Sequence, residues 1–182
     1  MATTATQSTG TNAQTALYDY EVIVVGAGVS GIYQIKRLLD LGVRATVLDA
    51  NEGLGGTWYN NRYPGARFDS ESYTYGYSFS RELLDEWDWS EHFAPQPETE
   101  RYLNHVADKF DLRRDIQFNT RVASTIYDEA RSLWTVNTTA GERFEAQFLV
   151  MATGGLSSPQ IPKFAGYDTF LAYLPGMVAA RL

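Results

Sequence analysis

The chain has 182 residues and a formal net charge of −7 at pH 7, and its 44% hydrophobic and 20% charged residues are typical of a globular protein. Because an acidic chain repels the phosphate backbone, we expect no nucleic-acid partner. The sequence contains no cysteine, which excludes disulfides, thiolate nucleophiles and cysteine metal sites within these residues. With only two histidines and no H-x-x-x-H spacing, we also expect no metal site.

The amino-terminal end is predicted to lie outside the folded part. Residues 1–17 are rich in Thr, Ala, Gln and Ser and lack the basic and apolar regions of a secretory signal, so we expect a disordered tail. No apolar run approaches the roughly 18 residues of a transmembrane helix, so we expect no membrane partner. A cytoplasmic location is the simplest interpretation of a cysteine-free chain of this kind.

The beginning of the folded part has the pattern of a βαβ unit. Tyr20–Val25 is a short apolar, β-branched run that ends at glycines, which predicts a buried strand. Val29–Leu41 has apolar residues at helical spacing, with Gly42 as the residue that ends the helix. Ala45–Leu48 is a second buried strand, closed by Asp49. Strand, helix and strand within about 30 residues form a βαβ unit.

The rest of the chain is predicted to continue as loop, helices and strands. Residues 51–80 are rich in glycine and aromatic residues and are expected to be a loop, followed by a short helix and a longer one. We then expect a short strand and a β-meander, whose last strand returns to the parallel sheet. The two helices are Ser80–Trp87 and Pro97–Phe110, and the strands are Ile116–Phe118, Arg121–Tyr127, Leu133–Asn137 and Arg143–Met151. The fold class is therefore α/β, with a parallel sheet plus a β-meander.

The turn after the first strand has the glycine spacing of a dinucleotide-binding loop, G-x-G-x-x-G. Gly26 permits the tight turn, Gly28 lets a pyrophosphate approach the backbone, and Gly31 lets the helix pack on the strand. The helix N-terminus offers amides to the phosphates, and Asp49 would accept both ribose hydroxyls. The pattern predicts a Rossmann-like domain, and the alternative is a glycine-rich turn with no ligand.

Two further segments favour FAD as the dinucleotide. Gly55-Gly56-Thr57-Trp58 follows the acidic residue closely, and FAD is long enough to need a second loop. A double glycine lets the backbone approach the ligand, while Trp58 offers a flat apolar wall. Ala152–Gly155 follows the last strand and would bring Gly154 beside the FAD. The alternatives are a surface loop with a core tryptophan and a simple strand-ending turn.

Many segments, in the same order along the chain, resemble Baeyer–Villiger monooxygenases over roughly residues 20–170. The most specific is the run R-Y-P-G-A-R-x-D, which favours the ketone-oxidising branch over the N-oxygenating flavin monooxygenases that share the glycine loops. The resembling segments are Gly55–Trp58, Asn61–Ser72, Tyr77–Ser80, Trp87, Trp89, Gln96–Glu98, Arg101–Leu103, Val106–Leu112 and Ala152–Gly154.

The resemblance implies a cofactor, a reaction and a set of contacts. Such enzymes bind FAD, reduce it with NADPH, and use dioxygen to convert a ketone to an ester or lactone. Ser30 and Asp49 would touch the ADP part of FAD, and Val122 would meet the adenine through its backbone. The residues expected at the flavin are Gly56, Thr57, Trp58 and Tyr75.

Three consecutive residues, Arg67, Phe68 and Asp69, would lie where flavin and nicotinamide meet. The resemblance implies that Asp69 helps to hold a catalytic arginine that comes from the NADPH domain, so Asp69 is the one candidate catalytic residue. Taken by itself, Asp69 is equally compatible with capping a turn, and Arg62 and Arg67 with solvated loop charges. Phe68 is larger than the residue expected at its position.

The resemblance ends near Phe170. The family pattern F-x-G-x-x-x-H-x-x-x-W-P should follow, but only Phe170 fits it, and residues 171–182 resemble nothing in the family. We therefore expect an FAD-binding domain over residues 18–170, a non-family tail over 171–182, and no NADPH domain or catalytic arginine. Such a fragment is not expected to turn over alone. The alternatives are a stand-alone FAD- or nucleotide-binding module and an inactive truncation.

Overall fold

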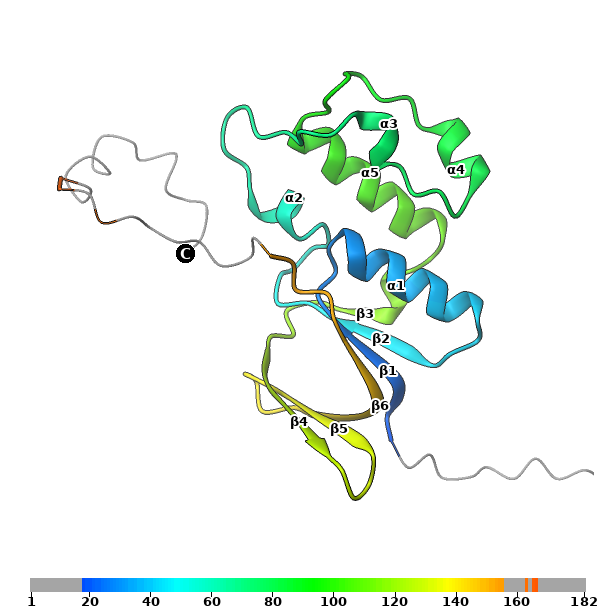
Figure 1. Ribbon diagram of the computed structural model, residues 1–182, viewed down its shortest axis with the longest axis vertical. Helices are drawn as coiled ribbons and strands as arrows, with labels where there is room; N and C mark the ends of the chain where they lie inside the picture. Colours follow the sequence, from blue (N-terminus) through cyan, green and yellow to red (C-terminus); the bar gives the residue numbers. More distant parts are fainter. Residues whose placement is uncertain (1–17, 156–162, 164, 167–182) are drawn as a thin grey trace, which may run out of the picture.

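A computed structural model describes residues 18–155, 163 and 165–166 of the chain. This part consists of one sheet and a group of helices that lies against it and extends beyond one end of the strands (Figure 1). The tails predicted at residues 1–17 and 171–182 lie outside the described residues. No helix of the described part is long and apolar enough to cross a membrane.

The sheet has six strands in the order β3-β2-β1-β6-β5-β4. Parallel pairing joins β1 to β2 and to β6, with Val22 opposite Ala45 on one side and Phe148 on the other. The pair β2–β3 is also parallel, whereas β4, β5 and β6 form the antiparallel meander. The predicted return of the meander to the parallel sheet is thereby confirmed. The strands are β1 (Tyr20–Val25), β2 (Ala45–Leu48), β3 (Ile116–Gln117), β4 (Val122–Asp128), β5 (Leu133–Thr138) and β6 (Arg143–Met151).

The main helices begin and end close to the predicted positions. The Ser80 hydroxyl accepts a hydrogen bond from the backbone N–H of Leu83 at 3.2 Å, as expected of the residue before a helix. Gly42 follows the first helix with φ 72°, a left-handed conformation that favours glycine. The helices are α1 (Val29–Asp40), α2 (Thr57–Asn60), α3 (Ser72–Tyr75), α4 (Arg81–Glu86) and α5 (Gln96–Lys109), with a 3₁₀ turn at Arg113–Asp115.

Residues 51–80 differ from the prediction of a loop, because they contain α2 and α3. Each is a single turn, which is too short to give an apolar periodicity in sequence. Both turns are anchored by burial, since Trp58 in α2 and Ser72 in α3 are buried. Tertiary packing therefore decides the local structure of this segment.

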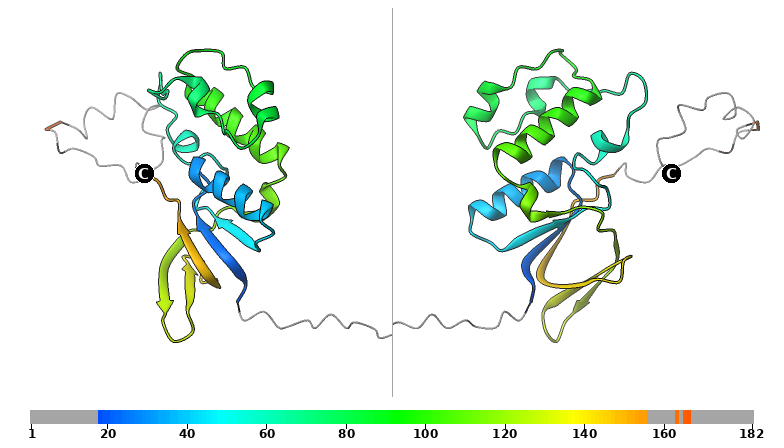
Figure 2. Two further views of the ribbon diagram at one scale, coloured as in Figure 1. Left: turned by 45° about the vertical axis from the view of Figure 1, so that its right-hand side comes forward. Right: turned by 180° about the vertical axis from the view of Figure 1, so that it is seen from behind.

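Apolar side chains pack on both faces of β1. Val22 and Val24 contribute to a cluster that reaches α1 and α5, whereas Ile23 and Val25 contribute to a second cluster with β5 and β6. Alternate residues of a strand point to opposite faces of a sheet, so burial on both faces explains the nearly continuous apolar run of β1. The views in Figure 2 show the helices on one side and the meander curving away from them. The glycine-rich turn that follows β1 therefore lies between the sheet and the helices.

Candidate functional site

The glycines of the first loop meet the end of β6. Gly26 has φ 104°, and a Cβ atom added to it would lie 2.6 Å from the backbone oxygen of Ala152. A Cβ atom on Gly31 would overlap the backbone oxygen of Gly26. The N–H of Ala152 in turn donates to the carbonyl of Val25 at 2.9 Å. The turn, the first helix and the end of β6 are therefore packed backbone to backbone, as the predicted roles of Gly26 and Gly31 require.

The second glycine loop packs against the first. The Gly55 N–H donates to the carbonyl of Ala27 at 2.9 Å. Gly56 has φ 56°, and a Cβ atom on it would lie 3.0 Å from the Cα atom of Gly28. Because neither glycine carries a side chain, the two loops present a continuous backbone surface at the N-terminus of α1. Thr57, the next residue, is exposed beside this surface.

The N-terminus of α1 offers amides for an anion. Gly28 precedes the helix and provides no side-chain hydrogen bond to its first turn. The first backbone bond of the helix runs from the N–H of Ile32 to the carbonyl of Gly28, at 3.0 Å. The amides of the first turn therefore have no partner inside the helix, and the helix dipole adds a partial positive charge. Ser30 lies exposed in this turn.

Asp49 is buried at the end of β2 and is already bound on both oxygens. Its Oδ2 accepts the Ala27 N–H at 2.6 Å, and its Oδ1 accepts the backbone N–H of Asn51 at 2.8 Å and the Asn51 side-chain amide at 3.0 Å. A carboxylate has about four acceptor positions. Three of them are used here, so accepting both ribose hydroxyls, as the sequence predicts, requires Asp49 to release one contact with Asn51.

Two segments distant in sequence reach the same end of the sheet. The N–H of Thr120 donates to the carbonyl of Asp49 at 2.8 Å, which places the segment before Val122 beside β2. Gly154 follows β6 with φ 73° and is exposed just beyond Ala152, the residue that faces Gly26. The structure therefore brings Gly154 and the segment just before Val122 to the end of the sheet where the glycine loops lie.

Aromatic rings gather behind the second glycine loop. The Trp58 Nε1–H donates to the Tyr75 hydroxyl at 2.6 Å. The rings of Phe68 and Tyr75 are stacked, with centroids 4.4 Å apart and planes 8° apart, and Trp58 meets Phe68 edge-on at 5.7 Å. Both Trp58 and Phe68 are buried, so these predicted flavin residues are also part of the core. Burial raises the pKa of Tyr75 above its ordinary value, although the Trp58 hydrogen bond lowers it.

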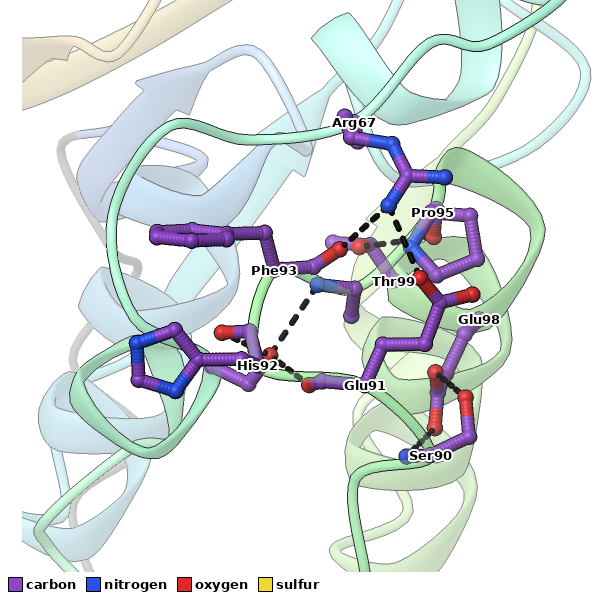
Figure 3. Close-up of polar contacts among 10 residues, drawn as sticks. Arg67, Ser90, Glu91, His92, Phe93, Pro95, Glu98 and Thr99 are labelled. Atoms are coloured by element: carbon purple, nitrogen blue, oxygen red, sulfur yellow. Dashed lines mark hydrogen bonds and ion pairs between the residues drawn. The ribbon is translucent and has the colours of Figure 1, made fainter.

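The structure does not bring the side chains of Arg67 and Asp69 together. The Arg67 Nη1 donates to the Glu91 carboxylate at 2.8 Å and to the carbonyl of Phe93 at 3.1 Å (Figure 3). These contacts and a β-bridge between Arg67 and Pro95 join the loop before α3 to the loop before α5. Asp69 is exposed, and no residue of the described part forms a hydrogen bond or ion pair with its carboxylate.

A buried acid anchors the second of these loops. Glu98 in α5 is buried, and its carboxylate accepts hydrogen bonds from the Ser90 N–H at 2.9 Å and the Ser90 hydroxyl at 2.5 Å (Figure 3). The hydroxyl of Ser72 extends the network to the carbonyl of Glu91 at 2.6 Å. The surface hollow lined by Ser72, Tyr73, Trp89, Ser90, Glu91 and His92 belongs to these loops and not to the glycine-rich junction.

Two supporting residues received no role in the sequence analysis. The Tyr77 hydroxyl donates to the carbonyl of Val29, at the start of α1, at 2.6 Å. The Gln96 side-chain amide donates to the carbonyl of Trp58. Both residues lie in segments that carry the family resemblance, and this resemblance is the one feature of the sequence that points to them. Their partners are backbone carbonyls, however, and a sequence pattern does not identify those.

Comparison with protein families and curated proteins places these features in a family. The model of the pyridine nucleotide-disulphide oxidoreductase family matches residues 23–175. The chain is 47% identical over 150 residues to the acetone monooxygenase (methyl acetate-forming) of Gordonia sp. (strain TY-5), which covers 82% of the chain and 28% of that protein. It is 44% identical over 152 residues to the phenazine N-monooxygenase PhzNO1 of Lysobacter antibioticus, and this match covers 83% of the chain and 28% of that protein. It is 43% identical over 160 residues to a Baeyer–Villiger monooxygenase of Pseudooceanicola batsensis, covering 87% and 29%.

Solved structures agree with the sequence comparison. A steroid monooxygenase bound to NADP superposes with a TM-score of 0.79 at 54% identity, over 83% of this chain and 29% of that one. OTEMO in complex with FAD and NADP superposes with a TM-score of 0.78 at 45% identity, over 83% and 28%.

The fold and the paired glycine loops define a Rossmann-type α/β domain of the kind found in flavoproteins. The chain belongs to the pyridine nucleotide-disulphide oxidoreductase family, and its relatives there include Baeyer–Villiger and related flavin monooxygenases. The predicted resemblance and fold class are thereby confirmed. The chain spans about 28% of the length of the first curated relatives that it matches.

The close packing at Gly31 predicts a large effect of a single methyl group. In Gly31→Ala the new Cβ atom would overlap the Gly26 carbonyl oxygen, so α1 must move away from β1. We expect a loss of about 1–3 kcal/mol in the free energy of unfolding, measured by urea denaturation. The matched control is Gly155→Ala, because no atom of the described residues lies within 4 Å of a Cβ atom there. Equal stability of the two variants would contradict this packing.

The burial of the Tyr77 side chain predicts a dependence of stability on alkaline pH. Burial, followed by the neighbouring Tyr102 and Tyr75, raises the pKa of Tyr77 well above its ordinary value of 10.0. The folded state therefore retains the proton where the unfolded chain loses it, so this contribution is complete below pH 10.0 and falls as the pH rises toward the raised pKa. We expect a smaller fall in Tyr77→Phe than in the wild type, measured by urea unfolding between about pH 9 and 11. Parallel pH profiles of the two proteins would refute the raised pKa of Tyr77 in the folded state.

Proposed function

We propose that this chain binds FAD across its two glycine loops. We further propose that it is the FAD-binding unit of an NADPH-dependent monooxygenase of Baeyer–Villiger type, which converts a ketone to an ester or lactone. The observation that carries the proposal is the contact between Gly28 and Gly56 at the open N-terminus of α1. It is supported by the solved relative OTEMO, which is in complex with FAD and NADP, and by the acetone monooxygenase.

The residues at the junction fit the ADP half of FAD. The free amides of the first turn of α1 suit a pyrophosphate, and the absence of a side chain at Gly28 lets it approach. Asp49 lies at the end of β2, where its carboxylate would meet the ribose after releasing part of its contact with Asn51. Gly26 and Gly31 shape the turn, and Ser30 and the backbone of Val122 complete this half.

The flavin half would lie along the second loop, with Gly56, Thr57, Trp58 and Tyr75 on one side and Gly154 on the other. When bound, FAD supplies the redox chemistry, receiving reducing equivalents from NADPH and delivering them to dioxygen. This chain contributes binding and orientation, and its buried aromatic residues exclude water from the loop.

Asp69 is proposed to act on a residue from elsewhere in a longer protein. Its exposed carboxylate is free to pair with a cation, which suits the arginine that the family resemblance implies. The side chains of Arg67 and Phe68 are not free in this way, because Arg67 is bound to Glu91 and Phe68 is buried. A contact of Arg67 with a nicotinamide cofactor would therefore require it to leave Glu91.

N-oxygenation is the second candidate for the reaction of the longer protein. The phenazine N-monooxygenase is about as similar to this chain as the Baeyer–Villiger relative, at 44% and 43% identity. The run from Arg62 to Asp69 favours the ketone-oxidising reaction. A stand-alone nucleotide-binding module stays a further alternative, and the cytoplasmic location stays a prediction.

FAD binding is tested directly by titration. We expect the purified chain to quench the fluorescence of added FAD and to shift its visible spectrum. Asp49→Ala should weaken binding at least about tenfold, because a charged acceptor near the ribose is lost. Asp88→Ala removes the same charge from an exposed position and serves as the control. Circular dichroism verifies that both variants are folded, and equal affinities for FAD would contradict the role of Asp49.

Turnover is assigned to the longer protein, so the chain alone should not show it. We expect no ketone-dependent consumption of NADPH when FAD, NADPH and cyclohexanone are added, because Asp69 has no cationic partner in the described part. Absorbance at the NADPH band and gas chromatography of products measure this. Formation of a lactone by the chain alone would contradict the proposal that turnover requires the longer protein.

A further inference from the structure

Phe68 is the most enclosed of the predicted flavin residues. The side chain is 5% exposed, with the ring of Tyr75 stacked on it and the rings of Trp58 and Trp89 nearly perpendicular to it, at centroid distances of 5.7 and 5.9 Å. An enclosed ring has little surface to offer a ligand. Any effect of Phe68 on a bound nucleotide must therefore pass through a neighbour, and its closest ring neighbour is Tyr75 at 4.4 Å.

The hydroxyl of Tyr75 is bound in a way that fixes its direction. An indole N–H can only donate, so the 2.6 Å hydrogen bond with Trp58 makes the phenol oxygen the acceptor. The phenolic proton must then point to another acceptor, and the described part of the chain provides none. Because Tyr75 is only partly buried, this O–H remains available as a donor.

This donor lies beside the second glycine loop. Trp58 is two residues after Gly56, which abuts Gly28, and its carbonyl is held by the side chain of Gln96 in α5. The backbone N–H of Trp58 also donates to the carbonyl of Gly55 at 3.1 Å. Trp58, the partner that fixes the Tyr75 hydroxyl, is therefore anchored next to the loop along which the flavin half of FAD would lie.

We propose that Phe68 is a positioning residue, whose stacked ring holds Tyr75 so that the Tyr75 O–H donates to an acceptor atom on the flavin half of FAD. This inference rests on the proposed binding of FAD and adds to it a residue that acts through another. Stacking restricts the tilt of the tyrosine ring, and the Trp58 hydrogen bond restricts the hydroxyl. Two constraints on one side chain define where its remaining proton points.

The test compares FAD with ADP, which lacks the flavin half. In Phe68→Leu the stacked ring is lost, and we expect the affinity for FAD to fall roughly threefold to tenfold while the affinity for ADP is unchanged. Phe68→Tyr keeps a ring of the same shape and should bind FAD within about twofold of the wild type. A residue that only fills the core would weaken both ligands together, or neither.

A double-mutant cycle tests whether Phe68 acts through Tyr75. Tyr75→Phe removes the donor but keeps the ring, so it should weaken FAD and not ADP. Adding Phe68→Leu to it should then cost little more, because the hydroxyl that Phe68 positions is already absent. Additive losses of FAD affinity in the double variant would overturn the inference, as would an equal loss for FAD and ADP in Phe68→Leu.

Failure of this inference is distinguishable from failure of FAD binding itself. If the wild-type chain binds neither FAD nor ADP, both proposals fail together. If it binds FAD and folded Phe68→Leu binds it equally well, only the role of Phe68 fails. Should Phe68→Leu not fold, Tyr75→Phe and Trp58→Phe decide, since each removes one partner of the hydrogen bond and keeps a ring. Unchanged FAD affinity in both would reject the positioned donor.

Discussion

The contact between two glycine loops is the constraint on which the candidate site depends. The hydrogen bond from Gly55 to Ala27 and the close approach of Gly56 to Gly28 bring two turns together without intervening side chains. Any Cβ atom at this contact would separate the loops or occupy the space in front of α1. The same junction also includes the end of β6, through the contact of Gly26 with Ala152. Three segments distant in sequence therefore share one backbone surface.

Asp49 links this surface to the sheet. Its carboxylate binds the amide of Ala27 inside the first loop, and its carbonyl accepts from Thr120 in the segment before β4. Burial of a carboxylate is costly unless its oxygens accept hydrogen bonds, and here they do so from backbone and side-chain amides. Asp49 thus has a structural role in the absence of any ligand. The proposed contact with a ribose would exchange part of the Asn51 interaction for a new one.

The helices beyond α1 serve as a support for the second loop. Gln96 of α5 holds the carbonyl of Trp58, and Tyr77 holds the first residue of α1. Stacked and edge-on rings around Phe68 fill the space between these anchors. Because aromatic side chains bury large areas while the loop has little regular structure, packing gives this segment its rigidity. The high aromatic content, 14% of the chain, is thereby explained without every ring having to face a ligand.

The sequence by itself determined the βαβ unit, the glycine positions and the family. The periodicities of the strands and helices extend over several residues and can be read from the sequence. The positive φ angles at Gly26 and Gly56 are conformations that glycine adopts without strain, so the glycine spacing indicates them. It did not determine α2 and α3, the pairing of Arg67 with Glu91, or the stacking of Phe68 on Tyr75. Those features depend on side-chain packing between the loops and α5, and no local pattern in the sequence encodes the packing partner. Only the tertiary structure decided them, because each contact exists only after the loops are folded onto α5.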